Sequence, residues 1–138
     1  MPAWLEQNPV WAGEILHWQW VLFAARLGLT SAYLLGGFTK LLNFSAAIAE
    51  QEQYGFRPGR LWAAVTIFVE LGGSLLILSG YMVWLGAGAL GCLTAVATLR
   101  ADNFWAQSGK ERVALANTFF EHVGLIAGFV LIALIYAR

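Results

Sequence analysis

Four long apolar stretches, separated by shorter polar segments, dominate the pattern of hydrophobic and polar positions along the chain. They cover approximately residues 18–42, 61–79, 82–99 and 113–136. A helix needs about 20 apolar residues to cross the hydrocarbon core of a bilayer, where an open-ended segment must satisfy its own backbone hydrogen bonds. Each stretch is therefore predicted to be a transmembrane helix, and the predicted fold is all-α, a bundle of four transmembrane helices.

The connections predict how these helices follow one another. Gly80 and Tyr81 alone separate the second span from the third, so these two helices are expected to form a tight antiparallel hairpin. The connections over residues 43–60 and 100–112 are longer and polar. No linker separates domains, so residues 1–138 are predicted to form a single membrane domain.

The segment ahead of the first span, residues 1–17, is rich in tryptophan. Trp4 and Trp11 lie within it, and Trp18 and Trp20 follow directly. Indole rings favour the headgroup level of a bilayer, so this N-terminal segment is predicted to lie along the membrane interface. A cleaved signal peptide carries Lys or Arg ahead of its apolar stretch. No Lys or Arg precedes the first apolar stretch here, so the first span is expected to be retained.

Composition narrows the class of protein. A hydrophobic content of 59% and a mean hydropathy of +0.66 are too high for a soluble domain. Eight basic and eight acidic residues give no net charge, so a nucleic-acid partner is not expected. The single cysteine, Cys92, cannot form an internal disulfide, a CxxC pair or a zinc site. Its position in an apolar run indicates a small packing residue.

The distribution of Lys and Arg predicts the orientation of the bundle. Those near the span ends on one side are Lys40, Arg57, Arg60, Arg100, Lys110 and Arg112, whereas Arg138 falls on the other side. Cytoplasmic loops carry an excess of these residues. Both termini are therefore predicted to lie outside the cytoplasm.

Ionisable residues inside the spans require partners. A charged side chain at the centre of a spanning helix costs about 2.5 to 3.5 kcal/mol on insertion scales. Arg26 and Glu70 each lie about nine residues into their spans, so in antiparallel helices they are expected to reach a similar depth and form an ion pair. Lys40 and Glu121 form the second expected pair.

Helical spacing predicts one polar or small face on each span, and small faces let membrane helices approach closely. These faces comprise Arg26, Thr30, Tyr33, Gly37 and Lys40 in the first span; Thr66, Glu70, Gly73 and Ile77 in the second; Trp84, Gly88, Gly91, Ala95 and Thr98 in the third; and Asn117, Glu121, Gly124 and Gly128 in the fourth. The four faces are expected to converge on a common axis as a polar seam.

The seam has two interpretations, which the sequence leaves open. Its charges are either structural pairs only, or they bind a polar headgroup, a quinone or a proton. The candidate residues for ligand binding or buried charge pairing are Arg26, Tyr33, Lys40, Glu70, Asn117, Glu121 and His122.

His122 could titrate near neutral pH or ligate a metal or haem. A haem between two histidines is excluded, because His17 precedes the first span and lies more than about 10 Å in depth from His122. A hydrogen bond within the protein, or to a quinone or lipid, is favoured over a haem with one histidine ligand, and no metal site is predicted. The sequence contains no GxGxxG, GxxxxGK[ST], HExxH or GxSxG motif, so catalytic residues stay unassigned.

Several motifs, in their order along the chain, resemble the DoxX family of small four-helix membrane proteins. They are Arg26; Gly37-Phe38-Thr39-Lys40-Leu41 with Phe44; Tyr54-Gly55 and Pro58; Glu70-Leu71-Gly72-Gly73 running to Leu78 and Gly80; and Phe104-Trp105. The resemblance runs from about Arg26 to the C-terminus. Two places depart from it: Asp102-Asn103 stands where the family often has a histidine, and the family's Lys-Asn pair aligns with Ala116-Asn117 or with Glu121-His122.

The resemblance implies a membrane subunit. Some relatives belong to membrane oxidoreductases that pass electrons from sulfur compounds to quinone, and others are associated with oxidative-stress or thiol-metabolism proteins. The sequence offers no flavin, iron-sulfur or thiol-pair site, so we expect no intrinsic cofactor; an exchangeable quinone or a redox-enzyme partner would carry any redox chemistry.

We therefore predict a subunit of the bacterial cytoplasmic (inner) membrane that binds quinone or lipid in the polar seam and supports a redox enzyme. Arg26 and Lys40 would donate to the ligand, while Glu70 and Glu121 would orient them or take up protons. A small proton-coupled transporter is one alternative, and Arg26 argues against it by neutralising a cation-binding carboxylate. A scaffold with purely structural charge pairs is the other, and a homo-oligomer stays open.

Overall fold

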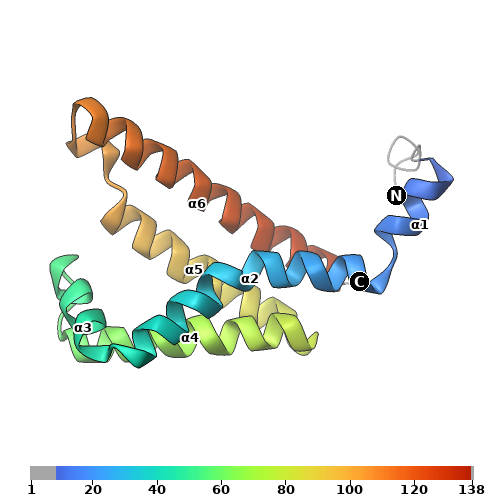
Figure 1. Ribbon diagram of the computed structural model, residues 1–138, viewed down its shortest axis with the longest axis horizontal. Coiled ribbons are helices and arrows are strands. Elements are labelled where there is room, and N and C mark those ends of the chain that lie inside the picture. Colours follow the sequence, from blue (N-terminus) through green and yellow to red (C-terminus); the bar gives the residue numbers. More distant parts are fainter. Residues whose placement is uncertain (1–8, 138) are drawn as a thin grey trace.

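The computed structural model describes residues 9–137, which fold into helices (Figure 1). Four of these helices are long and apolar enough to cross a membrane. They are α2 (Gln19–Leu42), α4 (Gly59–Ser79), α5 (Val83–Ala101) and α6 (Gly109–Tyr136). Each begins and ends within four residues of a predicted span, so the predicted four-helix membrane fold is confirmed.

Three short elements complete the described chain: α1 (Val10–Leu16), α3 (Phe44–Gln53) and the 3-10 turn η2 (Phe104–Ala106). The helix α1 lies beyond the start of α2 and buries none of its residues. Trp4 lies outside the described residues, and the interfacial position of this segment stays a prediction. The helix α3 was not predicted; the side chain of Asn43 accepts a hydrogen bond from the Ala46 amide at its start.

The helices form two arms (Figure 1). One arm contains α2, α3 and α4, which pack on one another, and the second contains α5, η2 and α6. The turn Gly80–Met82 joins α4 to α5 as the predicted antiparallel hairpin, and Gly80 adopts the left-handed conformation that glycine tolerates, with φ 78°. We call the end with this turn the closed end, and the opposite end, where the arms diverge toward α3 and η2, the open end.

Apolar side chains fill the bundle axis at the closed end. The buried cluster comprises Tyr33, Ile77, Val83, Ala87, Leu90, Phe129 and Ile132. A Cβ atom added to Gly86 of α5 would lie 2.6 Å from the carbonyl oxygen of Gly73 on α4. These two glycines therefore let the arms approach closely where they meet.

The predicted inward faces are right for two helices and wrong for the other two. The buried residues of α2 include Thr30, Tyr33 and Gly37, and those of α4 include Thr66, Glu70, Gly73 and Ile77, as expected. In α5, Thr98 is buried but Trp84 and Gly88 are exposed, and in α6 the buried residues are Phe129 and Ile132. Small and apolar residues of α5 and α6 occur around the whole circumference of each helix, so polarity does not mark the inward face.

Candidate functional site

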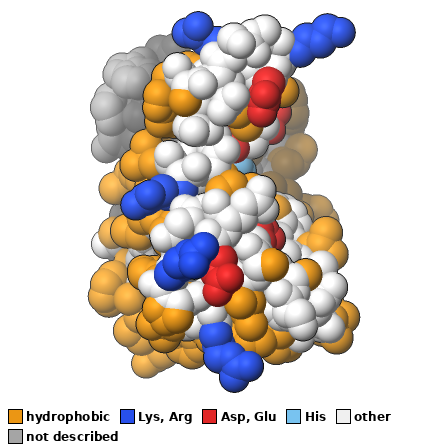
Figure 2. Space-filling view, turned by 90° about the vertical axis from the view of Figure 1, so that its left-hand side faces the viewer, with side chains coloured by type: hydrophobic (Ala, Val, Ile, Leu, Met, Phe, Trp, Pro, Cys, Tyr) orange, Lys and Arg blue, Asp and Glu red, His pale blue; other side chains and the backbone are white. Residues whose placement is uncertain are grey.

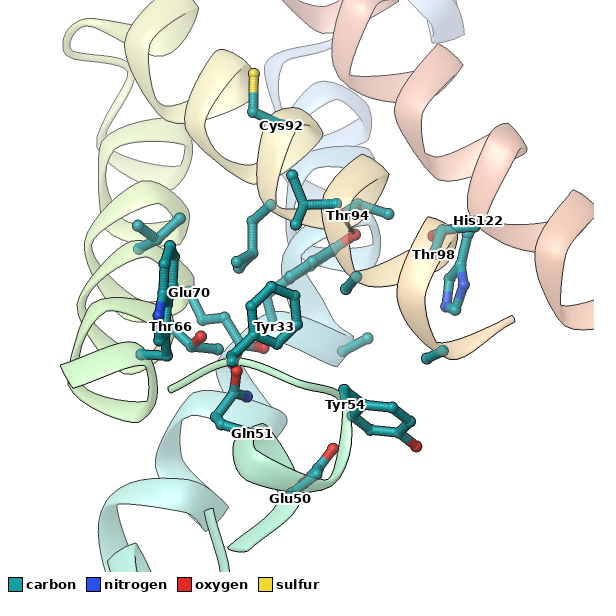
Figure 3. A pocket seen from close by; sticks show the side chains of 18 of the residues that line it. Tyr33, Glu50, Gln51, Tyr54, Thr66, Glu70, Cys92, Thr94, Thr98 and His122 are labelled. Carbon is teal, nitrogen blue, oxygen red and sulfur yellow. Dashed lines mark hydrogen bonds between the residues drawn. The ribbon is translucent and has the colours of Figure 1, made fainter. Parts of the chain in front are cut away.

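A cavity of about 540 Å³ lies between the two arms and reaches toward the open end (Figure 3). Its polar lining comprises Tyr33, Lys40, Glu50, Gln51, Tyr54, Thr66, Glu70, Cys92, Thr94, Thr98, Asp102 and His122, contributed by both arms. Figure 2 looks onto the open end, where Lys and Arg side chains project and acidic side chains lie between the arms. The predicted seam residues Tyr33, Lys40, Thr66, Glu70 and Thr98 therefore line an open cavity rather than a closely packed axis.

Lys40 and Glu70 form an ion pair on one side of this cavity. The Lys40 ammonium donates to Oε1 of Glu70 at 2.8 Å, and the Glu70 side chain is buried. A Cβ atom on Gly36 would lie 3.0 Å from Oε2 of the same carboxylate, and one on Gly37 would lie 2.8 Å from Leu71. The two glycines thus bring α2 against α4 at the depth of Glu70.

The predicted pair of Arg26 with Glu70 is wrong. Glu70 faces Gly36, which lies ten residues, or about 15 Å, further along α2 than Arg26. The prediction counted each position from the end of its own span, but Arg26 lies beside Ile77 and Leu78 at the last turn of α4, so α2 begins beyond that turn. The two groups therefore differ in depth.

Arg26 instead serves the closed end. Its Nη1 donates to the carbonyl oxygens of Ile77 at 2.9 Å and Leu78 at 3.4 Å, at the last turn of α4. The guanidinium carbon also lies 5.6 Å from the Phe23 ring centroid and 5.5 Å from that of Tyr136. A cation here bonds to carbonyl groups of the last helical turn and complements the helix dipole. Arg26 thus connects α2, α4 and α6.

The predicted pair of Lys40 with Glu121 is also wrong. Lys40 bonds to Glu70, while Glu121 and Asn117 lie exposed on α6 and do not line the cavity. Both precede His122, in the part of α6 that extends past the end of α5. The seam prediction assigned them inward because they share a helical spacing with Gly124, which is itself exposed.

The second polar contact of the cavity joins His122 to Asp102, which the sequence analysis did not identify as a site residue. Nδ1 of His122 lies 2.7 Å from Oδ2 of Asp102. Asp102 is buried at the end of α5, and its amide donates to the carbonyl of Thr98 at 2.9 Å. No sequence signal indicated this contact, because His122 lies nine residues, or about 14 Å, into its predicted span, whereas Asp102 lies in the preceding connection.

Two threonines of α5 complete the polar lining. The Thr94 hydroxyl donates to the carbonyl of Leu90 at 2.7 Å, so the Tyr33 hydroxyl, 2.5 Å away, must be the donor to Thr94. Thr98 is buried, and its Oγ1 has no hydrogen-bond partner within the described chain. An unsatisfied buried hydroxyl costs about 1–3 kcal/mol.

Cys92 also lines the cavity and is exposed, so its interpretation as a packing residue is wrong. Figure 3 shows Cys92 at the margin of the pocket, with its sulfur pointing away from Tyr33 and Thr94. Within residues 9–137, no group of three His, Cys, Asp or Glu side chains is placed to hold a metal ion. His17 bonds to the carbonyl of Gly13 at 2.7 Å near α1, away from His122.

Comparison with known proteins matches the DoxX family to residues 21–105, more than half of the chain. The chain belongs to the DoxX family. The match begins in α2 and ends within η2, so it includes Tyr33, Lys40, Glu70, Thr98 and Asp102 of the cavity. No curated protein and no solved structure matches the chain.

The DoxX cavity thus has two polar positions on largely apolar walls. We call Lys40 with Glu70 the Lys40 pole, and His122 with Asp102 and Thr98 the His122 pole. Figure 3 shows them on opposite sides of the pocket, with Glu70 on α4 and His122 on α6. Each pole can donate to and accept from a polar ligand atom. The apolar wall between them can contact a ring or a chain.

Proposed function

We propose that this DoxX protein binds a quinone in the cavity between the arms and exchanges it with a partner redox enzyme in the bacterial cytoplasmic membrane. The observation that supports this most is the cavity itself, at about 540 Å³, between helices that can span a membrane. Sites for small molecules commonly measure about 300–1,000 Å³ and combine apolar walls with a few polar groups. A quinone, which is a lipophilic ring with two polar oxygens, matches this combination of apolar surface and a few polar groups.

The Lys40 pole offers the donors that a quinone oxygen needs. The bond to Glu70 takes one of the three N–H groups of the Lys40 ammonium, and the others are available to a ligand. Apolar residues beside the poles, including Val69, Leu93 and Leu125, would contact the ring and its chain. A quinone therefore fits both the polar and the apolar parts of the lining.

The charge of the lining favours a neutral ligand over an anionic lipid headgroup. Three carboxylate residues, Glu50, Glu70 and Asp102, face the cavity together with Lys40 and His122. A phosphate would meet more negative than positive charge in this low-dielectric space. The lipid that the sequence left as an alternative is thus disfavoured unless its headgroup is neutral or cationic.

A redox partner follows from the chemistry of the side chains. Lys, His, Asp, Glu and Tyr bind ligands and move protons, but none of them accepts an electron pair from a quinol or delivers one to a quinone. A quinone bound here would therefore exchange electrons with another protein. The open end is the proposed cytoplasmic side, because Arg57, Arg60 and Lys110 lie in or beside the elements at this end.

Analysis of co-purified quinone tests the proposal. The protein would be purified from native membranes in detergent, extracted with organic solvent, and its quinone content per protein measured by mass spectrometry. We expect quinone in the wild type and a several-fold loss in Lys40→Gln. Lys110→Gln removes an equivalent charge outside the cavity and should leave the content unchanged. Absence of quinone from the wild type, or equal retention in both variants, would contradict the proposal.

A further inference from the structure

The His122 pole presents a defined hydrogen-bond acceptor to the cavity. A carboxylate only accepts hydrogen bonds, so the Nδ1 atom of His122 must donate to Asp102 across the 2.7 Å contact. In the neutral imidazole, the proton then lies on Nδ1 and Nε2 carries a lone pair. His122 is partly exposed and lines the cavity, so Nε2 is the nitrogen left for a ligand.

The same pole also contains a hydrogen-bond donor. Thr98 lies one helical turn before Asp102 on α5, and its buried Oγ1 has no partner among the described residues. The oxygen is covered by protein, so its proton reaches a ligand when the Thr98 side chain turns toward the cavity that it lines. Figure 3 draws Thr98 and His122 on the same side of the pocket, on α5 and α6.

The Lys40 pole repeats this combination. The Lys40 ammonium keeps N–H donors beyond the one that bonds to Oε1 of Glu70, while Oε2 of that carboxylate is an acceptor beside it. Tyr33 adds a further acceptor, because its proton is used on Thr94. Both poles therefore pair donors with acceptors.

A hydroxyl group donates one hydrogen bond and accepts others, whereas a carbonyl oxygen only accepts. A carbonyl at the His122 pole could use the Thr98 proton, but its lone pairs would face the lone pair on Nε2. We propose that the cavity binds the reduced, dihydroxy form of the ring more tightly than the oxidised quinone, and that Nε2 of His122 makes this distinction. This inference rests on the proposed function and assigns the redox form that the site selects.

Binding of one compound in its two redox forms tests the inference. A para-benzoquinone with a decyl chain and its hydroquinone would be titrated anaerobically into protein stripped of bound quinone. Both forms are measured at the same pH. We expect the hydroquinone to bind roughly tenfold more tightly, as a lost hydrogen bond in a desolvated site implies.

Two substitutions separate the role of His122 from that of Thr98. In His122→Asn, the amide nitrogen can still donate to Asp102, but no acceptor stands at the Nε2 position. The preference should fall to about twofold or less, while affinity for the oxidised quinone stays unchanged. Thr98→Val should weaken both forms by a similar factor, because a hydroxyl and a carbonyl both accept from Thr98. Thr118→Val, on an exposed threonine of α6, and His17→Asn are the matched controls.

The outcomes distinguish the redox preference from the proposed quinone site. Equal affinity for the two forms in the wild type, or a preference that survives in His122→Asn, would overturn the inference and leave the proposed quinone site intact. Binding of neither form would refute the proposed function itself. If His122→Asn does not fold, judged by its gel-filtration profile in detergent, the wild-type preference and the equal losses in Thr98→Val still decide.

Discussion

The closed and open ends of the bundle differ in what lies between the helices: packed apolar side chains at one end and a cavity with polar groups at the other. At the closed end, residues such as Ile77, Leu90 and Phe129 fill the axis, and two glycines bring the arms together. At the open end, the same helices diverge around a cavity in which Lys40 bonds to Glu70 and His122 to Asp102. Apolar packing joins the arms at one end, which leaves the other end free to hold a ligand.

The comparison also separates two uses of intramembrane charge. Arg26 donates to backbone carbonyls and contacts aromatic rings at the closed end, and it does not line the cavity, although its buried Nε has no hydrogen-bond partner among the described residues. Lys40 and His122 each contact a carboxylate and also line the cavity. Charge alone therefore does not mark the candidate site; a position on the cavity lining does.

The largest effect is expected where the arms meet. Gly86→Leu forces a side chain toward the Gly73 carbonyl, and overpacking of this kind typically costs about 1–3 kcal/mol or more. We expect loss of the folded protein or a large fall in Tm, measured by thermal unfolding in detergent. Gly88→Leu is the control, because no atom lies within 4 Å of its added Cβ. Equal stability of the two variants would show that the closed end is not tightly packed.

Breaking the Lys40 pole should have the next largest effect. Lys40→Met leaves the buried Glu70 carboxylate without its cation, and the loss of one partner of a buried pair costs about 3–5 kcal/mol, less here because Lys40 is partly exposed. The double variant Lys40→Met with Glu70→Met should recover most of that stability while binding no quinone. A double variant as unstable as the single one would indicate that the pair itself holds the arm together.

A smaller effect is expected for Arg26. Arg26→Gln removes the charged donor to Ile77 and Leu78, and a hydrogen bond to a charged group contributes about 1.5–3 kcal/mol. The free energy of unfolding should fall by a part of this amount, since glutamine can keep one bond. Quinone content should not change in the protein that remains folded. A selective loss of quinone would place Arg26 within the site.

The smallest effect is expected for the outward face of α6. Glu121→Gln and Asn117→Ala alter exposed side chains that do not line the cavity, and such substitutions usually change stability by less than about 0.5 kcal/mol. Unfolding and quinone content should both match the wild type. A loss of co-purified partner protein alone would reveal a contact surface on this face.

The four spans could be predicted because hydrocarbon imposes length and polarity on every helix that crosses it. The inward faces of α2 and α4 could also be predicted, because Thr30, Tyr33, Thr66 and Glu70 are polar and a lipid-facing position would leave them unsatisfied. In α5, glycines occur at both buried and exposed positions, such as Gly86 and Gly88, so the same reasoning has no marker to use.

The contacts between charged side chains of different helices could not be predicted, because they depend on the relative depth of helices that differ in length and entry point. Arg26 and Glu70 have similar positions within their own spans yet lie at different levels. Asp102 was treated as part of a loop, although the end of α5 keeps it buried beside His122. Asp102 and His122 both lie where the sequence departs from the family motifs, but the resemblance did not indicate that they contact each other.

The length of α6 has a consequence for how the protein meets its membrane. At 1.5 Å per residue, the 28 residues of α6 extend over about 42 Å, whereas the 19 residues of α5 extend over about 28 Å. A bilayer core of about 30 Å matches α5 and is too thin for an upright α6. An α6 that crosses such a bilayer must therefore tilt, or its ends must emerge among the headgroups, so lipids of different thickness would favour different tilts of this helix.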